Sequence, residues 1–235
     1  MNEASKTNRI RSDDFKRRYF SGRVIDIGCG GDVVVPHAIP FDRPQGDAQW
    51  ILDQFEPESF DCVHSSHCLE HMENVLIALC NWWALVKPGG YLVLVVPDAD
   101  LYEQGIWPSI FNTDHKATFT LGNPKGWGKP SYNTEALVSD LPGSEIIDAR
   151  VQDNGYGYNL MLSRPTMLSA YLYTRWTPFR ERVFSKLQRH GLPVQSMNRI
   201  SNKVERALGK PVAQTYGPAL AQIQVIAQKR TSYLR

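Results

Sequence analysis

Three glycines follow a short apolar segment near the start of the chain. The segment Val24–Ile27 is mostly β-branched apart from Asp26 and predicts a buried strand, and Gly28, Gly30 and Gly31 come directly after it. Glycines let the backbone adopt a positive φ and let a ligand approach more closely than a side chain would allow. Because parallel sheets bind ligands at the carboxyl ends of their strands, this loop is a candidate cofactor site, with a simple turn as the alternative.

Histidines supply the side chains that exchange a proton near neutral pH. His71 opens a predicted helix and His115 lies in the segment 112–116. If the chemistry needs a general base, we expect His115 in preference to His71, with a structural role for each as the alternative. His64, His67 and His71 would share one face only if all three were helical, and His64 is predicted on a strand. We therefore predict no structural metal, while leaving open a bound divalent ion.

Alternating strands and helices must position these residues. Apolar side chains recur at helical spacing from Met72 to Val86, and the sequence Lys87–Gly90 ends that helix. The apolar run Tyr91–Val96 then predicts a strand covered on both faces. Further strands are predicted at 24–27, 37–42, 49–52, 60–64, 145–151 and 221–227, short helices at 13–20 and 133–138, and a long loop or lid at 99–132. This order predicts an α/β fold with a Rossmann-like, seven-stranded, mostly parallel sheet and helices on both faces.

Composition narrows the class of protein. With 235 residues, 42% of them hydrophobic and 21% charged, the chain is expected to form a single domain over 1–235. No apolar run approaches the roughly 18 residues that a membrane-spanning helix needs. The polar start of the chain predicts no secretory signal, and the four cysteines show no CxxC spacing. We expect a cytoplasmic protein with reduced thiols.

The segment 159–218 differs from the rest of the chain in charge. Between 159 and 210 it carries ten basic and two acidic residues, a formal charge of about +8, although the whole chain carries only +2. Aromatic residues interleave with its arginines, as expected of a helical cap before the last strand that binds an anionic ring or phosphate. A helical cap whose aromatic residues form its own core is one alternative. RNA binding is another, and it is disfavoured because no RNA-binding motif is present and the isoelectric point is near 8.3.

Three motifs in order give the chain a family resemblance. They are Val24–Gly31, then Phe60–His71 with the sequence FDCVHSSHCLEH, and Leu85–Leu92 with the sequence LVKPGGYL. From about Arg23 to Asp98 the chain resembles a class I S-adenosylmethionine-dependent methyltransferase of the small-molecule, ubiquinone-biosynthesis-like type. Each motif alone is weak, but the three at this spacing are specific. The resemblance implies S-adenosyl-L-methionine as the cofactor.

The resemblance also implies roles for residues at the strand ends. Asp26 would orient the glycine loop and face the amino-acid end of the cofactor, Asp42 would accept the ribose hydroxyls, and Asp53 would contact the adenine, with Asp47 as the alternative. The full set of expected cofactor-binding residues is Asp26, Gly28, Cys29, Gly30, Asp42, Arg43, Asp53, Ser66 and His67. A turn-forming role is the alternative for Asp42.

A nicotinamide dinucleotide site is the nearest competitor for the glycine loop. Its fingerprint needs a third glycine three residues after the second and a helix of ordinary length, but position 33 is valine and Pro36 shortens any helix. We therefore expect methyl transfer to a small, anionic acceptor, most simply to an oxygen of a sugar-like or phosphorylated metabolite. The alternatives are a non-catalytic S-adenosylmethionine-binding protein and an RNA methyltransferase. The sequence leaves the oligomeric state open.

Overall fold

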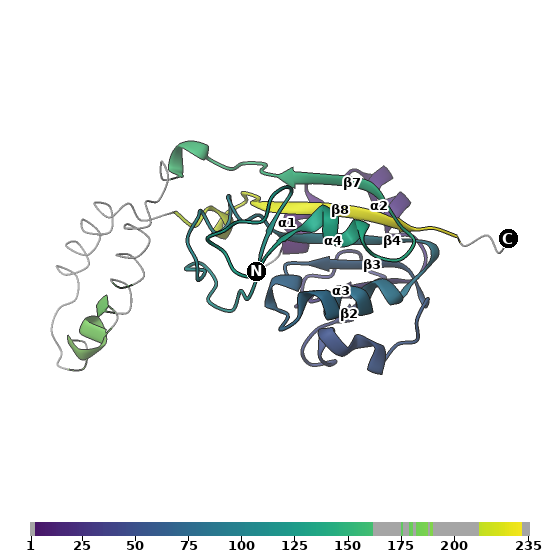
Figure 1. Ribbon diagram of the computed structural model, residues 1–235, viewed down its shortest axis with the longest axis horizontal. Coiled ribbons are helices and arrows are strands. Elements are labelled where there is room, and N and C mark those ends of the chain that lie inside the picture. The colour runs from purple at the N-terminus through teal and green to yellow at the C-terminus, as the bar shows by residue number, and fades with distance from the viewer. Residues whose placement is uncertain are drawn as a thin grey trace.

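Six strands form the main sheet of the computed structural model, which describes residues 3–161, 175, 179–180, 182–187, 189 and 212–231 (Figure 1). Their order across the sheet is β2-β1-β3-β4-β8-β7. The bounds are β1 (Val24–Ile27), β2 (Ile39–Phe41), β3 (Phe60–Ser66), β4 (Val86–Pro97), β7 (Ser144–Gln152) and β8 (Gln222–Lys229). The first four strands in this order are parallel, and β8 runs antiparallel to both β4 and β7. The structure confirms the mostly parallel α/β sheet.

The strand predicted at 49–52 is wrong, and with it the count of seven. These residues belong to η1 (Ala48–Asp53), a 3₁₀ helix that Asp47 caps by accepting a hydrogen bond from the Gln49 amide at 2.9 Å. Trp50 projects outward with 47% of its surface exposed. Strand β1 already pairs with β2 and β3, so this segment has no place beside it. The other six predicted strands are confirmed.

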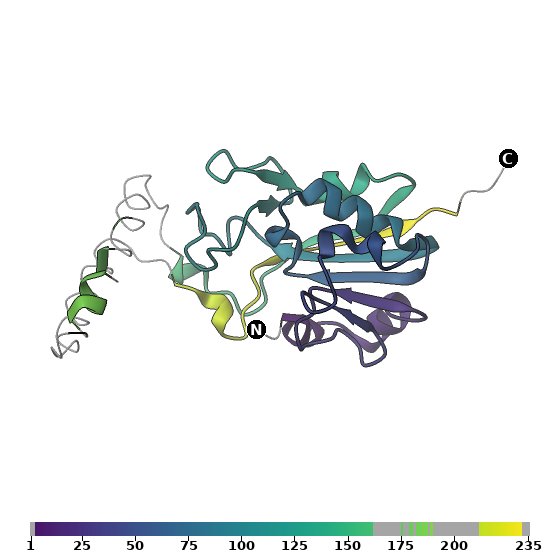
Figure 2. The same ribbon diagram turned by 90° about the horizontal axis from the view of Figure 1, so that it is seen from below.

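Helices cover both faces of the sheet (Figure 2). On one face lie α3 (Val75–Ala84) and α4 (Thr134–Ser139), and on the other lie α1 (Glu3–Asn8) and α2 (Asp13–Tyr19). Successive strand residues point to opposite faces, so Ile25, Val63 and Leu92 pack in the core on the α3 side, whereas Val24, Cys62 and Val93 pack on the α2 side. The sheet is therefore covered on both faces, as the continuous apolar run of β4 predicts.

Helices α1 and α2 replace an ordinary crossover helix between β1 and β2. The link between these strands, residues 28–38, is described throughout and contains no helix, whereas the sequence predicts at most an abbreviated one. Tyr19 of α2 and Phe20 pack instead against Val34 and Val35 of the link. Ser12 caps α2 by accepting a hydrogen bond from the Phe15 amide, which confirms that predicted helix start.

The segment after β4 is more ordered than the predicted loop at 99–132. It contains β5 (Thr118–Thr120) and β6 (Ser131–Asn133), which pair in parallel as a small second sheet. Most of the predicted basic insertion at 159–218, and hence its role as a cap, lies outside the described residues. Among the helices that the structure does describe, none has the length and apolar character needed to cross a membrane.

Candidate active site

A cleft opens where β1, β2 and β3 end. It consists of two adjoining hollows, with cavity volumes of about 270 and 670 Å³. The residues common to both walls are Gly28, Asp42, His67, His71 and Asn112. Together the hollows have the size of a site for a cofactor and a small substrate. The cleft lies at the carboxyl edge of the parallel strands, where the glycine loop predicts it.

The glycine loop is fixed by backbone hydrogen bonds. The Gly28 amide donates to the Phe41 carbonyl at 2.7 Å, and the Gly30 amide donates to Asp42 Oδ2 at 2.7 Å. Both glycines have a positive φ, of 75° and 57°. A Cβ on Gly28 would lie 2.4 Å from that of Cys68, so only glycine fits there. Asp42 thus holds the loop from the end of β2, and both glycines expose backbone to the cleft.

Asp26 sits behind this loop in a buried polar network. Its Oδ1 lies 2.6 Å from His64 Nδ1, and its Oδ2 accepts a hydrogen bond from the Val34 amide at 2.6 Å. On the far side of the ring, Arg11 approaches His64 Nε2 at 3.5 Å and also donates to Gln224 Oε1. Burial lowers the pKa of His64 and lowers that of Arg11 to about 10. A neutral His64 therefore donates to Asp26 through Nδ1 and accepts from Arg11 through Nε2.

The remaining predicted cofactor residues do not all reach the cleft. Cys29 and Ser66 line the smaller hollow, and the Ser66 hydroxyl is buried with no hydrogen-bond partner among the described residues. Arg43 lines the larger hollow, where it pairs with Asp114 at 3.2 Å. Asp53 is exposed and belongs to neither wall. The structure thus gathers all the expected cofactor residues except Asp53 at one edge of the sheet.

Asp47 takes the place beside the cleft that was expected of Asp53. It lines the larger hollow from the position just before η1, whose first turn it caps. Asp53 lies away from the cleft because it is the last residue of the 3₁₀ helix, at the opposite end from Asp47.

The two candidate bases lie together. His71, 21% of whose side chain is exposed, lines both hollows, whereas His115 is almost fully buried on the wall of the smaller one. Their ring centroids are 5.0 Å apart. Burial acts to lower the pKa of His115, but its 2.6 Å hydrogen bond to Glu103 and the nearby charge of Glu70 outweigh this and raise it. The sequence could not show that residues 44 positions apart meet, because the strand order brings them together.

Some residues of the cleft carried no expected role. They are Glu3, Glu70, Tyr102 and Asn112, while Glu103, which lines neither hollow, bonds to His115. Glu70 lies inside the Leu-Glu-His part of the second motif, so its position was available from the sequence. Glu3 reaches the smaller hollow from α1, a six-residue helix that no sequence pattern announces.

The chain is similar to a known protein family and to solved structures. A family model described as "Methyltransferase domain" matches residues 5–127, more than half of the chain. Among solved structures, an S-adenosylmethionine-dependent methyltransferase from Archaeoglobus fulgidus is 17% identical with a TM-score of 0.48, over 97% of this chain and 95% of its own. One from Thermotoga maritima is 15% identical with a TM-score of 0.46, over 97% and 88%. Likeness at this level supports no residue-by-residue comparison. None of the curated proteins matches the chain.

The cleft suits a sulfonium cofactor. Its smaller hollow combines exposed glycine backbone, the unpaired Ser66 hydroxyl and the carboxylates of Asp26 and Asp42. These groups match a ligand that carries hydroxyls, an amino-acid end and a positive charge. The chain belongs to the methyltransferase-domain family and is an S-adenosylmethionine-dependent methyltransferase.

Proposed function

We propose that the enzyme methylates an oxygen of a small, anionic acceptor, with the cofactor lying along both hollows, its amino-acid end beside Asp26 and its adenine beside Asp47, and with the acceptor at the wall that the two hollows share. The observation that carries this arrangement is that the two hollows adjoin through Gly28, Asp42, His67, His71 and Asn112. S-adenosylmethionine supplies an electrophilic methyl group on a positively charged sulfur. The acceptor oxygen forms a bond to that carbon while the carbon–sulfur bond breaks and leaves its electron pair on sulfur.

The contribution of the protein is chiefly to align the two molecules and exclude water. Asp42 would hold the ribose, and Asp26 would keep the glycine loop in place through the Val34 amide. A hydroxyl acceptor must also lose its proton, and His71 and His115 are the groups beside the shared wall that could receive it directly or assist its loss.

The anionic character of the acceptor is supported by the charge of the segment 159–218. In the described part of the chain, the smaller hollow is lined by five carboxylates and no lysine or arginine. That wall favours the cationic cofactor. Arg43 and Lys116 line the larger hollow, but each pairs there with a carboxylate, so the support for an anionic acceptor comes from the charge of the segment 159–218.

Label transfer tests the proposal. The protein is incubated with methyl-labelled S-adenosylmethionine and a small-molecule extract, and the products are separated by anion exchange. We expect labelled products that the anion exchanger retains. Mild base should release no labelled methanol from them, whereas it would release labelled methanol from methyl esters. Labelled products that pass through unretained would contradict the anionic acceptor. Tight binding of S-adenosylhomocysteine without any label transfer would contradict catalysis on a small molecule.

A further inference from the structure

Glu70 is a buried carboxylate without a hydrogen-bond partner. It lies in η2 (Leu69–His71), directly after β3, with none of its side chain exposed. Neither Oε1 nor Oε2 has a hydrogen-bond partner in the described structure. A buried charge in this situation is costly unless a positive charge or a metal ion compensates it. The carboxylate therefore marks a position where a cation is expected.

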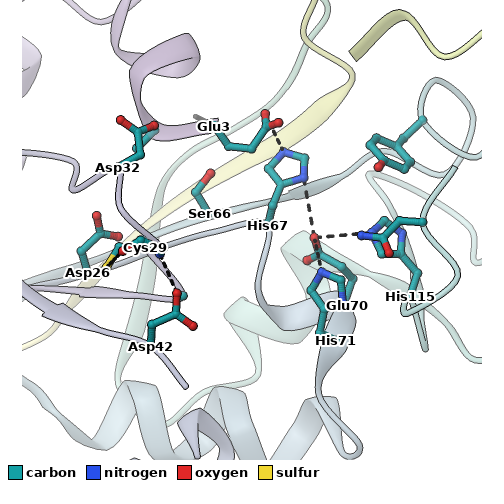
Figure 3. Close-up of a pocket in the computed structure, with 15 residues that line it drawn as sticks. Glu3, Asp26, Cys29, Asp32, Asp42, Ser66, His67, Glu70, His71 and His115 are labelled. Carbon is teal, nitrogen blue, oxygen red and sulfur yellow. Dashed lines mark hydrogen bonds and ion pairs between the residues drawn. The ribbon is translucent and has the colours of Figure 1, made fainter. Parts of the chain in front are cut away.

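Three histidine rings surround one oxygen of this carboxylate (Figure 3). From Glu70 Oε1, His67 Nδ1 is 3.6 Å away, His71 Nε2 is 3.8 Å away and His115 Nε2 is 3.9 Å away. These distances are too long for hydrogen bonds, whose heavy atoms lie about 2.7–3.2 Å apart. The three nitrogens come from the end of β3, from η2 and from the segment after β4, and those of His71 and His115 lie within 4.8 Å of each other and of Glu70.

The other nitrogen of each ring is held by an oxygen. His115 Nδ1 bonds to Glu103 Oε1 at 2.6 Å, His71 Nδ1 to the Asp114 carbonyl at 3.2 Å, and His67 Nε2 to Gln222 Oε1 at 3.0 Å. Each outer nitrogen can therefore be the protonated one, which leaves the inner nitrogen with a free lone pair. Histidines that bind metals are oriented in this way.

A protonated His115 does not explain the cluster. It would be bonded to Glu103 and would lie 3.9 Å from Glu70, close enough to attract that charge but too far for a hydrogen bond, so one positive charge would face two buried carboxylates. A divalent cation would balance both carboxylates, and its ligands would be Glu70 and the inner nitrogens of His71 and His115.

We propose that Glu70, His71 and His115 bind one divalent transition-metal ion, with zinc as the best match. Ligands about 2.1 Å from a tetrahedral ion lie about 3.4 Å from one another, compared with 3.8 and 3.9 Å from Glu70 Oε1 to the inner nitrogens of His71 and His115. Two imidazoles with one carboxylate favour zinc or a neighbouring transition metal over magnesium or calcium, which prefer oxygen ligands. The ligand atoms of Glu70, His71 and His115 all lie within 4.8 Å of one another.

The ion would lie at the wall that the two hollows share, because its ligand His71 lines both of them. There it would bind an acceptor oxygen and make its proton easier to lose. In that case His71 and His115 act through the metal and do not remove the proton themselves. This role rests on the proposed function, whereas metal binding does not.

Calorimetry on tag-free, full-length protein stripped with a chelator tests the site. We expect Zn²⁺ to bind with a stoichiometry of one and at least about 100-fold more tightly than Mg²⁺. Glu70→Gln keeps the shape but removes the charge, and His115→Gln removes one ligand, so each should weaken Zn²⁺ binding at least about 10-fold. Glu103→Gln should weaken it by about 10- to 100-fold through the orientation of His115. The control is His37→Gln, an exposed histidine outside the cleft, which should bind as the unaltered protein does.

Circular dichroism and binding of S-adenosylhomocysteine establish that each variant is folded. In folded protein, absence of Zn²⁺ binding at micromolar concentrations would overturn the proposal. Unchanged Zn²⁺ affinity in both Glu70→Gln and His115→Gln, or tighter binding of Mg²⁺ than of Zn²⁺, would also overturn it. Because the readout is binding, a failure here is distinct from a failure of methyl transfer.

Discussion

Replacing Asp26 with asparagine should destabilise the fold far more than its small change in shape suggests. The carboxylate accepts two hydrogen bonds, from His64 Nδ1 and from the Val34 amide. Asparagine offers one oxygen and one NH₂ group, so one of these donors would face another donor. His64 cannot correct this by moving its proton to Nε2, because the Arg11 guanidinium lies there at 3.5 Å. The conflict is therefore built into the network.

Two terms set the size of the effect. A buried donor left without an acceptor costs about 1–3 kcal/mol. The substitution also removes the charge that does most to favour the buried Arg11 cation, and breaking a buried charge pair costs about 3–5 kcal/mol. Since Arg11 contacts Asp26 only through His64, the second term is smaller here, and we expect a total loss of about 3 kcal/mol in the free energy of unfolding, measured by urea denaturation.

A surface carboxylate provides the matched control. Asp61 pairs with Lys87 at 2.9 Å with 42% of its side chain exposed, so Asp61→Asn should cost no more than about 1 kcal/mol. Combining Asp26→Asn with Arg11→Met removes the guanidinium and frees His64 to change its proton position. The double variant should be more stable than the sum of the single losses by about 1 kcal/mol or more. Equal losses for the two Asp→Asn variants, or additivity in the double variant, would refute this account.

Three further predictions concern the same edge of the sheet. Asp42→Ala should weaken binding of S-adenosylhomocysteine by about 10- to 100-fold in calorimetry, whereas Asp53→Ala should leave it unchanged; equal weakening would contradict the position of Asp53 outside the cleft. Because burial lowers the pKa of His64, this side chain binds a proton more readily in the unfolded chain, so its contribution to stability should be lost as the pH drops below about 6.5 and should be absent in His64→Gln; the raised pKa of His115 acts in the opposite direction, so the difference between the two proteins in urea titrations is the test. Gly28→Ala should lower both the thermal midpoint and the affinity for S-adenosylhomocysteine, since its Cβ would collide with Cys68; unchanged values would show that the loop can move aside.

Most of the fold could be predicted because its strands are strongly patterned. The continuous apolar run of β4 and the helical spacing of α3 fixed the centre of the sheet, and the glycine loop marked its binding edge. The failure at 49–52 has a local cause. Apolar side chains over four residues cannot distinguish a strand from a 3₁₀ turn, and the Asp47 cap decided in favour of the turn.

The cofactor side of the cleft was more predictable than the acceptor side for a related reason. Asp26, Gly28 and Gly30 follow one another on one strand and its loop, so their proximity is local in sequence. Asp42 needed only the pairing of β2 with β1. The acceptor side draws instead on η2, the segment after β4 and strand β8, and proximity among these depends on the complete strand order.

The cluster around Glu70 shows how that order makes a site. Strand β4 lies beside β3, so the chain that leaves β4 passes the residues that leave β3. The Lys116 amide then donates to the Glu70 carbonyl at 2.7 Å, which fixes His115 next to that residue. Spacing within the segment 64–71 argued against a metal site because His64 belongs to the strand, and His64 is indeed committed to Asp26. The set that comes together is instead Glu70, His71 and His115, and because His115 comes from the segment after β4, no pattern confined to one stretch of sequence contains it.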